Sequence, residues 1–378
     1  RRPPRSTLSS SSAASDVYKR QDLDRNDYPK LRMKNMLLLA FGQKKMINRP
    51  VVGILHLVVY VGFILINIEL LEILLDGIFG THRVFAPYLG SLYNFLIAMF
   101  EIFALLVLVA VIFFWTRRNV SKIKRFWKSE MKGWPKQDAD NILYFEVILM
   151  VLFLSMNATD SLLQNFGAES YIKAGSFPVS QFLTPLFEEF KFETLMILER
   201  SFWWLHIIGI FAFLNYLYYS KHLHILLAFP NTYFANLEIK GKFRVNPHIK
   251  SEVQLMLNPQ ALMPELSSTI PDKFGATDVF DLSWVQLMNS YSCTECGRCS
   301  SECPANITGK KLSPRAIMMK TRDRLEEVGK NINKNGGKFI SDGKQLLNDY
   351  IKPEELWACT SCNACVEACP IEIDPLSI

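Results

Sequence analysis

Residues 293–304 read CTECGRCSSECP, and residues 359–370 read CTSCNACVEACP. Both segments follow the pattern CxxCxxCxxxCP, and together they contain all 8 cysteines of the 378-residue chain. A disulfide framework does not confine its cysteines to two short clusters. Such clusters in an otherwise cysteine-free chain indicate metal or iron–sulfur ligation in a reducing compartment.

The duplicated spacing is that of the two-cluster bacterial ferredoxins, in which three thiolates of each run bind one cubane and the fourth crosses to the other. The sequence therefore predicts two 4Fe-4S clusters. The ligands expected for cluster 1 are Cys293, Cys296, Cys299 and Cys369. The ligands expected for cluster 2 are Cys359, Cys362, Cys365 and Cys303. A structural zinc site would explain neither the third cysteine nor the proline of each run.

The insertion between the two runs predicts a helical domain. SPRAIMMKTRDRLEEVG, residues 313–329, is expected to form a helix that begins at Ser313 and Pro314. Residues 285–378 then resemble the alpha-helical ferredoxin of heterodisulfide reductases and of the iron–sulfur subunits of succinate and anaerobic glycerol-3-phosphate dehydrogenases. Because a helix follows the first run while the second nearly reaches Ile378, we expect this domain to be truncated at its C-terminus.

The composition upstream favours a membrane protein. The chain is 49% hydrophobic and 21% charged, with a mean hydropathy of +0.12, which excludes a disordered protein. We therefore do not interpret the net charge of +6 as a sign of nucleic-acid binding. Four apolar stretches approach the roughly 20 residues that a membrane helix needs. They cover residues 51–75, 91–115, 141–163 and 201–229. The fold class expected is mainly α, a transmembrane helical bundle followed by the ferredoxin domain.

Three flanking segments complete the organisation. Residues 1–21 are Ser-rich without a starting Met, and we interpret them as a disordered non-native scar, with a native disordered tail as the alternative. Residues 22–50 mix basic and apolar side chains and predict a cytoplasmic interfacial segment on the membrane surface. Residues 230–284 contain several prolines and predict an extended linker.

Basic residues predict the orientation of the spans. Residues 117–136 contain eight Lys or Arg against Glu130 as a lone Glu, whereas residues 76–90 have only His82 and Arg83 as basic residues. An excess of Lys and Arg marks cytoplasmic loops, so the basic loop is expected in the cytoplasm. With four spans, residues 22–50 and the chain after Pro230 are cytoplasmic too. The expected location is the cytoplasmic (inner) membrane of a prokaryote.

Three histidines on the predicted spans are candidate haem ligands. His56 lies near the start of the first span, and His206 and His224 lie 18 residues apart on the last. In one continuous helix this spacing is five turns, about 27 Å, and puts both rings on one face. Antiparallel spans place His56 and His224 at the same depth, so this pair is expected to bind a haem b. Interfacial histidines at helix ends are the alternative, and His82 is expected on the surface.

The segment LHIIGIFAFLNYLYYSKHLHILLAFP, residues 205–230, resembles a haem-carrying helix of the cytochrome b (gamma) subunit of respiratory nitrate reductases and its heterodisulfide reductase relative. The resemblance implies a nitrate reductase gamma-like membrane domain over residues 51–229, with His206 and His224 as ligands of two haems. The partner helix of that family has two histidines ten residues apart. Here only His56 is present and Ile66 takes the second place, so a second haem on His206 lacks its expected partner.

Carboxylates on the predicted spans are a further functional signal, because ionisable groups inside a membrane are costly. They are interpreted as proton-handling groups near a quinone site. For three of the four, pairing with Arg83 or Arg200 is the alternative. The four residues are Glu69, Glu72, Glu101 and Asp160.

The fusion of both parts over residues 22–378 resembles heterodisulfide-reductase-like membrane iron–sulfur oxidoreductases. The resemblance implies an electron-transfer subunit that connects quinone, haem b and two 4Fe-4S clusters with a cytoplasmic partner carrying a CCG-type cysteine-rich domain. The sequence shows no nucleophile, phosphate-binding loop or flavin fingerprint, so no catalytic residue is expected in this chain. The alternative is a haem-free membrane-anchored ferredoxin that acts as a docking platform.

Overall fold

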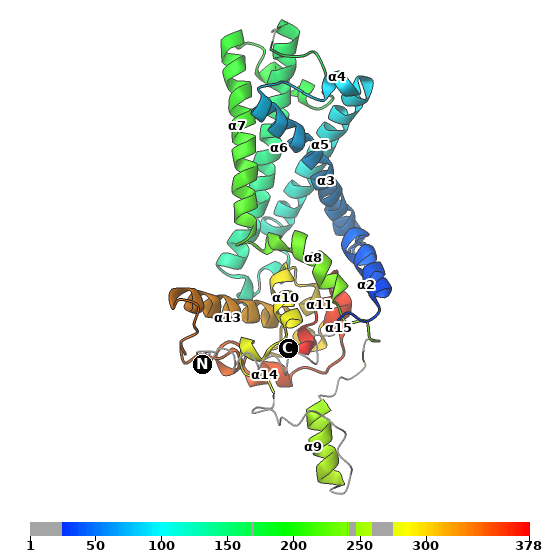
Figure 1. Ribbon diagram of the computed structural model, residues 1–378, viewed down its shortest axis with the longest axis vertical. Coiled ribbons are helices and arrows are strands. Elements are labelled where there is room, and N and C mark those ends of the chain that lie inside the picture. The colour runs from blue at the N-terminus through cyan, green and yellow to red at the C-terminus, as the bar shows by residue number, and fades with distance from the viewer. Residues whose placement is uncertain (1–24, 168–169, 240, 242–246, 259–274) are drawn as a thin grey trace, which may run out of the picture. The chain divides into compact units, whose positions relative to one another are not determined.

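The computed structural model describes residues 25–167, 170–239, 241, 247–258 and 275–378 (Figure 1). This part of the chain is mainly helical, and its only β-type pairing is an isolated bridge between Leu347 and Ile351. The predicted fold class is confirmed, whereas the interpretation of residues 1–21 lies outside the described residues. The chain forms two compact units. We call Met46–His222 the membrane unit, and the chain up to Lys45 together with Leu223–Ile378 the iron–sulfur unit.

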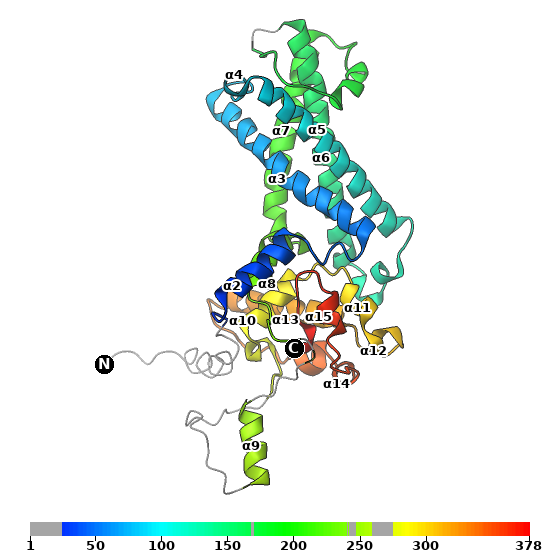
Figure 2. The same ribbon diagram turned by 90° about the vertical axis from the view of Figure 1, so that its right-hand side faces the viewer.

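Four long helices dominate the membrane unit (Figure 2). They are α3 (Pro50–Phe79), α5 (Ser91–Asn119), α6 (Trp134–Phe166) and α7 (Phe192–Leu217), with the short α4 (Ala86–Leu89) before α5. All four are long and apolar enough to cross a membrane, which agrees with the prediction of four apolar helices among the described residues. The first three extend beyond their predicted apolar stretches, since polar residues at the ends continue the helices. Glycines in left-handed conformation, Gly80 and Gly167, end α3 and α6.

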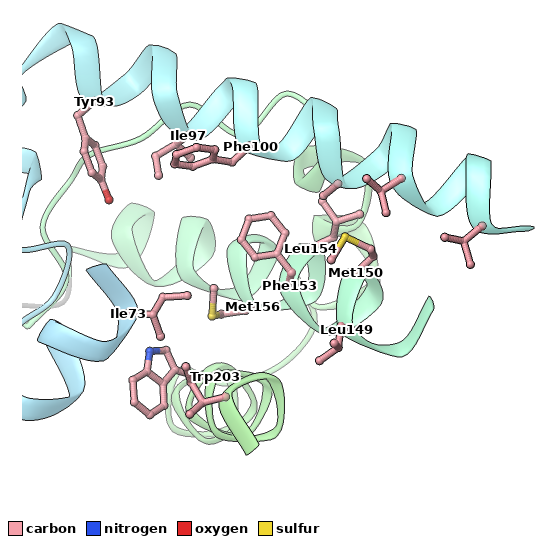
Figure 3. Packing of buried hydrophobic residues seen from close by; sticks show 14 of the residues in the cluster. Ile73, Tyr93, Ile97, Phe100, Leu149, Met150, Phe153, Leu154, Met156 and Trp203 are labelled. Atoms are coloured by element: carbon pink, nitrogen blue, oxygen red, sulfur yellow. The ribbon is translucent and has the colours of Figure 1, made fainter. Parts of the chain in front are cut away.

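The core of the membrane unit lies between these helices (Figure 3). Helix α6 packs against α5 and α7, and α3 packs against α5. Ile97 of α5 and Phe153 of α6 are completely buried. A Cβ at Gly62 of α3 would lie 2.6 Å from Cγ2 of Val107, so this glycine lets α3 and α5 approach closely.

The span predicted over residues 201–229 is interrupted, and this corrects the sequence analysis. Helix α7 ends at Leu217, a 3₁₀ turn covers Lys221–Leu223, and α8 (His224–Tyr233) begins anew. The buried Asp138 stabilises the break. Its carboxylate accepts hydrogen bonds from the Tyr216 hydroxyl at 2.6 Å and from the Lys221 amide at 3.0 Å, which satisfies backbone that the helix no longer pairs. His206 and His224 therefore do not share one continuous helix.

The iron–sulfur unit is built from short helices around α13. Its helices are α2 (Pro29–Met36), α8, α9 (Pro247–Leu257), α10 (Trp284–Ser292), α11 (Arg298–Glu302), α12 (Pro304–Ile307), α13 (Pro314–Lys334), α14 (Pro353–Trp357) and α15 (Ala364–Ala368). The Ser313 hydroxyl accepts from the Ala316 amide and caps α13, as the sequence predicts. Apolar side chains of α13, including Ile317 and Val328, form a core with residues 279–312 and 346–351.

The segment predicted as an extended linker, residues 230–284, contains helical structure. Helix α9 lies within it and begins at Pro247, because proline is well tolerated at the first position of a helix. The 3₁₀ turn Val279–Asp281 and Asp278 join the ferredoxin core: Arg324, buried on α13, donates to Asp278 at 2.8 Å. The C-terminal end of the predicted linker is therefore part of the domain.

Candidate iron–sulfur and histidine sites

The two cysteine runs have the same backbone conformation. In the first run Glu295 and Gly297 are left-handed, with φ of 57° and 72°. In the second run Ser361 and Asn363 occupy the equivalent positions, with φ of 55° and 59°. A five-residue helix follows each loop, α11 and α15, and the two helices pack on each other. Residues other than glycine seldom adopt the left-handed conformation. Two left-handed residues in each run curl the loop so that its cysteines face one side.

The fourth cysteine of the second run lies beside the first run. Burial raises the pKa of the Cys369 thiol to about 12, and interaction with the Cys296 and Cys293 sulfurs adds to the effect. Burial also raises the pKa of Cys299, with Cys293, Cys296, Cys369 and Cys365 contributing. Cys369 therefore lies near the three sulfurs expected to share cluster 1 with it, and Cys365 of the second run also lies near Cys299.

The sulfurs of the second run make the complementary contact. Burial raises the pKa of Cys365 to about 12, and Asp374, Cys303 and Cys359 raise it further. Cys303 thus lies near the second run, as the crossed arrangement requires. Raised thiol pKa values mean that these sulfurs need a positive partner to be held as thiolates, and iron supplies that charge. The ligand assignment of individual cysteines stays a prediction.

Backbone amides point at the sulfurs of both runs. The amide of Ile373 donates to Sγ of Cys369 at 3.3 Å, and the amide of Ser361 donates to Sγ of Cys359 at 3.4 Å. Such bonds stabilise ligating sulfur and tune the reduction potential of a cluster. Among the described residues, no three His, Cys, Asp or Glu side chains converge closely enough to hold a single metal ion. A 4Fe-4S cubane spreads its four thiolates around a larger group than a single ion, so its ligands need not converge to that degree.

The surroundings of the two runs differ. Glu295, in the first loop, is 2% exposed and forms an ion pair with Arg322 of α13. Arg298 of the same run is buried and donates to the Lys45 carbonyl at 3.3 Å. In the second run Cys359 and Cys362 are exposed, and the nearby Trp357 is 88% exposed. The first loop is thus enclosed by protein, and the second faces outward from its unit.

The candidate haem ligands fall in both units. His56 on α3 and His206 on α7 belong to the membrane unit, and His224, the first residue of α8, belongs to the iron–sulfur unit. His206 is 2% exposed, and its Nδ1 lies 3.1 Å from the Leu149 carbonyl oxygen. A carbonyl only accepts, so Nδ1 carries the hydrogen and Nε2 keeps its lone pair. Metal-binding histidines commonly have their second nitrogen held in this way.

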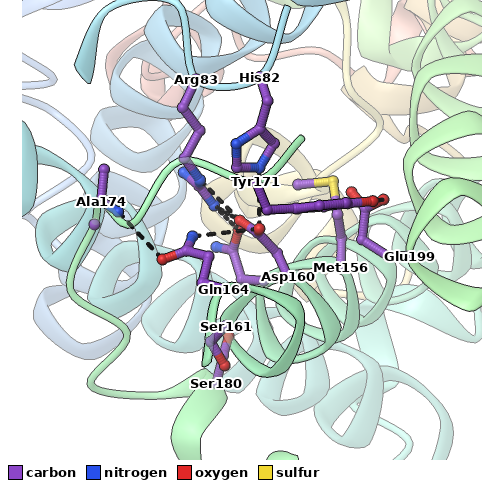
Figure 4. Close-up of polar contacts among 12 residues, drawn as sticks. His82, Arg83, Met156, Asp160, Ser161, Gln164, Tyr171, Ala174, Ser180 and Glu199 are labelled. Carbon is purple, nitrogen blue, oxygen red and sulfur yellow. Dashed lines mark hydrogen bonds and ion pairs between the residues drawn. The ribbon is translucent and has the colours of Figure 1, made fainter. Parts of the chain in front are cut away.

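A buried polar network in the membrane unit joins Arg83 and Asp160, and the sequence predicted only part of it (Figure 4). The guanidinium of Arg83 is buried and donates to Asp160 at 2.8 Å, to the Tyr93 hydroxyl at 3.1 Å and to Asn157 at 3.1 Å. His82, expected on the surface, lies with Nε2 3.0 Å from Asp160 and accepts from the Ile172 amide at Nδ1. Asp160 therefore pairs with Arg83, which was the structural alternative for this carboxylate.

Two other intramembrane carboxylates have different surroundings. Glu101 is completely buried and accepts from the amides of Val179 and Ser180 at 2.9 and 3.1 Å and from Asn157 at 3.2 Å. It anchors the loop before α7, a role that sequence spacing gives no signal for. Glu72 accepts from the Tyr93 hydroxyl at 2.7 Å, which joins it to the Arg83 network.

Comparisons with known proteins agree with the cysteine geometry. Residues 292–373 match the family described as "4Fe-4S dicluster domain". The chain is 26% identical over 370 residues to "Probable iron-sulfur-binding oxidoreductase FadF" of Bacillus subtilis, an alignment of 90% of this chain and 48% of that protein. It is 24% identical over 377 residues to "EtfAB:quinone oxidoreductase" of Syntrophomonas wolfei, covering 93% of this chain and 48% of that protein.

A shorter match concerns the iron–sulfur part. The chain is 28% identical over 114 residues to an iron–sulfur subunit of the CoB–CoM heterodisulfide reductase of Methanopyrus kandleri, covering 30% of this chain and 43% of that protein. No solved structure matches the chain. The chain spans about half the length of the first two relatives. The chain is thus similar to iron–sulfur oxidoreductases, and it contains a 4Fe-4S dicluster domain and four helices long and apolar enough to cross a membrane.

Proposed function

We propose that this chain relays electrons between a quinone in the bilayer and a soluble oxidoreductase partner, by way of haem b and two 4Fe-4S clusters. The observation that supports the proposal is that Cys369 lies near Cys293 and Cys296 of the first run while Cys303 lies near Cys365 of the second, as expected if the fourth ligands cross between two clusters. When bound, the clusters supply one-electron transfer at potentials that their surroundings set. The thiolates hold the iron, and the buried first loop excludes water from one side.

The haem part of the proposal rests on the histidines. We assign His56 and His224 as the ligand pair of one haem b, and His206 as the ligand of a second. The orientation of the buried His206 ring supports a metal-binding role, because Leu149 fixes its tautomer and leaves Nε2 able to ligate. Haem would supply a further one-electron carrier.

The location and partners complete the proposal. The ferredoxin domain lies on the cytoplasmic side, since the basic loop after α5 marks that side. The partner is a cytoplasmic oxidoreductase of heterodisulfide-reductase type with a CCG-type domain, and quinone is the membrane substrate. The similarity to a quinone oxidoreductase and to a heterodisulfide reductase subunit supports both assignments.

One observation favours the haem-free alternative, a membrane-anchored ferredoxin. The end of α7 at Leu217 removes the five-turn spacing that related His206 to His224. In this alternative the four long helices only anchor the clusters, and the histidines make ordinary hydrogen bonds.

A reduced-minus-oxidised visible spectrum of the purified full chain separates the two functions. The proposal requires the sharp α band of a low-spin haem b in addition to about eight irons in two cubanes. His56→Ala should abolish the α band of the haem bound by His56 and leave both cluster signals in EPR, because the cysteines lie in the other unit. His222→Ala, a neighbouring histidine with no proposed ligand role, is the control. A His56 variant with a full haem complement contradicts the assignment, and a wild-type protein without haem supports the alternative.

A further inference from the structure

The strongest unassigned feature is a groove along α2 in the iron–sulfur unit. It is shallow and open to solvent, with a volume of about 590 Å³. Its lining is mainly apolar and includes two basic residues. The principal lining residues are Lys30, Met33, Lys34, Leu37, Leu38 and Tyr233.

Helix α2 buries one of its basic residues and exposes several apolar ones. Arg32 is 2% exposed and donates to the carbonyls of Tyr233 and Ala235 at 3.1 and 3.0 Å, whereas Lys30 and Lys34 are exposed. Asn35 donates to the Thr232 carbonyl at 2.7 Å. Five large apolar side chains of α2 and of the π-helical turn Leu37–Phe41 that follows it are each between 42% and 50% exposed, whereas Leu39 is buried. The five are Leu31, Met33, Leu37, Leu38 and Phe41. A patch of this kind on a water-exposed helix marks an interaction surface.

The charges beside this patch are positive and unbalanced. Lys30 and Lys34 are four residues apart and therefore lie on one side of α2, at the rim of the groove. Both are exposed, and neither has an ion-pair partner among the residues that the structure describes. The nearby Asp27 is taken up by an ion pair with Arg32 at 2.5 Å. An apolar face with uncompensated lysines is the pattern of a helix that lies in an anionic membrane surface.

Chain connectivity limits the distance between this segment and α3. Residues 42–49 join it to Pro50, the first residue of α3. Eight residues span at most about 28 Å even when fully extended. Helix α2 is therefore tethered by this short connection to α3, one of the helices long and apolar enough to cross a membrane.

We propose that this groove binds an anionic phospholipid of the bilayer. The phosphate of the headgroup lies between the ammonium groups of Lys30 and Lys34, and an acyl chain lies along Met33, Leu37 and Leu38. This site does not depend on the electron-transfer function proposed above. The proposed lipid site gives the predicted interfacial segment a specific class of ligand. A purely apolar anchor, or a surface that contacts another protein, would not select an anionic lipid.

Native mass spectrometry of the full chain, released from nanodiscs containing equal amounts of phosphatidylglycerol and phosphatidylcholine, tests the proposal. The wild type should retain phosphatidylglycerol preferentially, and Lys30→Gln/Lys34→Gln should reduce this preference roughly tenfold or more. The matched control is Lys330→Gln/Lys334→Gln, an exposed pair with the same spacing on α13. Cluster EPR signals confirm that both variants are folded.

Three outcomes would overturn the proposal. The first is an unchanged lipid preference in the Lys30/Lys34 variant, and the second is an equal loss in the control pair. The third is displacement of the bound lipid by soluble glycerol phosphate, which would make the site a receptor for free phosphate esters. Leu37→Ser/Leu38→Ser should lower retention of both lipids alike, and full retention in this variant also contradicts the assigned acyl-chain position.

Discussion

The two cysteine runs share a sequence pattern and a backbone but not an environment. Both place left-handed residues at the third and fifth positions and continue into a five-residue helix. Yet Glu295 is buried in the first loop with Arg322 as its partner, whereas Cys359 and Cys362 of the second are exposed. Spacing therefore specifies how a loop wraps a cluster. The rest of the chain decides which loop is buried and which is exposed.

Removal of the fourth cysteine of either run should have the largest effect. Cys369→Ala should damage the cluster of the first run, and Cys303→Ala that of the second, because each fourth cysteine lies beside the opposite run. Iron content should fall by up to about half in each variant. EPR of the reduced proteins distinguishes the remaining clusters. If each variant instead loses the cluster of its own run, the crossed assignment is wrong.

The second largest effect is expected in the thiol reactivity of the iron-free protein, because the cysteines of the two runs differ in burial. Cys359 and Cys362 are exposed, while Cys293 is buried and burial raises its pKa to about 11. At pH 8 a thiol of that pKa is thiolate in only about one molecule in a thousand, so Cys293 should alkylate at least roughly a hundredfold more slowly than the exposed pair.

The pH dependence gives this prediction a sign. The thiolate fraction of Cys293 rises about tenfold per pH unit until the pH reaches its pKa, so its alkylation should accelerate up to about pH 11. Mass spectrometry after timed iodoacetamide treatment measures each cysteine separately. Equal rates in the two runs at pH 8 would show that the enclosure of the first loop does not persist without iron.

The pattern of residues predicted the repeat, the α13 helix and the four long apolar helices, because these depend on local spacing and hydropathy. It did not predict the end of α7. That break depends on Asp138, which comes from α6 and caps the Lys221 amide across a long sequence separation. Equally, no local signal showed that Glu101 would anchor residues 179 and 180. Long-range polar contacts of single residues are the part that sequence patterns do not contain.

Removal of the ion pair should affect only the first run. Arg322→Ala removes the ion-pair partner that the buried Glu295 carboxylate has on α13, and breaking a buried pair costs about 3–5 kcal/mol. Hydrogen exchange of residues 293–299 should therefore speed up, while residues 359–365 stay unchanged. Lys311→Ala is the control, because its ion pair with Glu354 is exposed to solvent and therefore contributes little to stability. Similar exchange rates in both variants would mean that Arg322 does not brace the loop.

The smallest effects are expected at the fifth positions, where the runs differ as Gly297 and Asn363. Both residues are left-handed, and a β-carbon there costs about 1–2 kcal/mol unless the side chain is Asn or Asp. Gly297→Ala should therefore destabilise the first loop by about 1 kcal/mol, and Gly297→Asn by less. In the second loop Asn363→Gly should be nearly neutral and Asn363→Ala unfavourable. Rates of cluster loss under a chelator, measured by visible absorbance, give the order. Alanine tolerated at position 363 but not at position 297 would contradict this explanation. The stability of the first loop would then depend on the protein enclosing Gly297 and not on the left-handed conformation that both loops share.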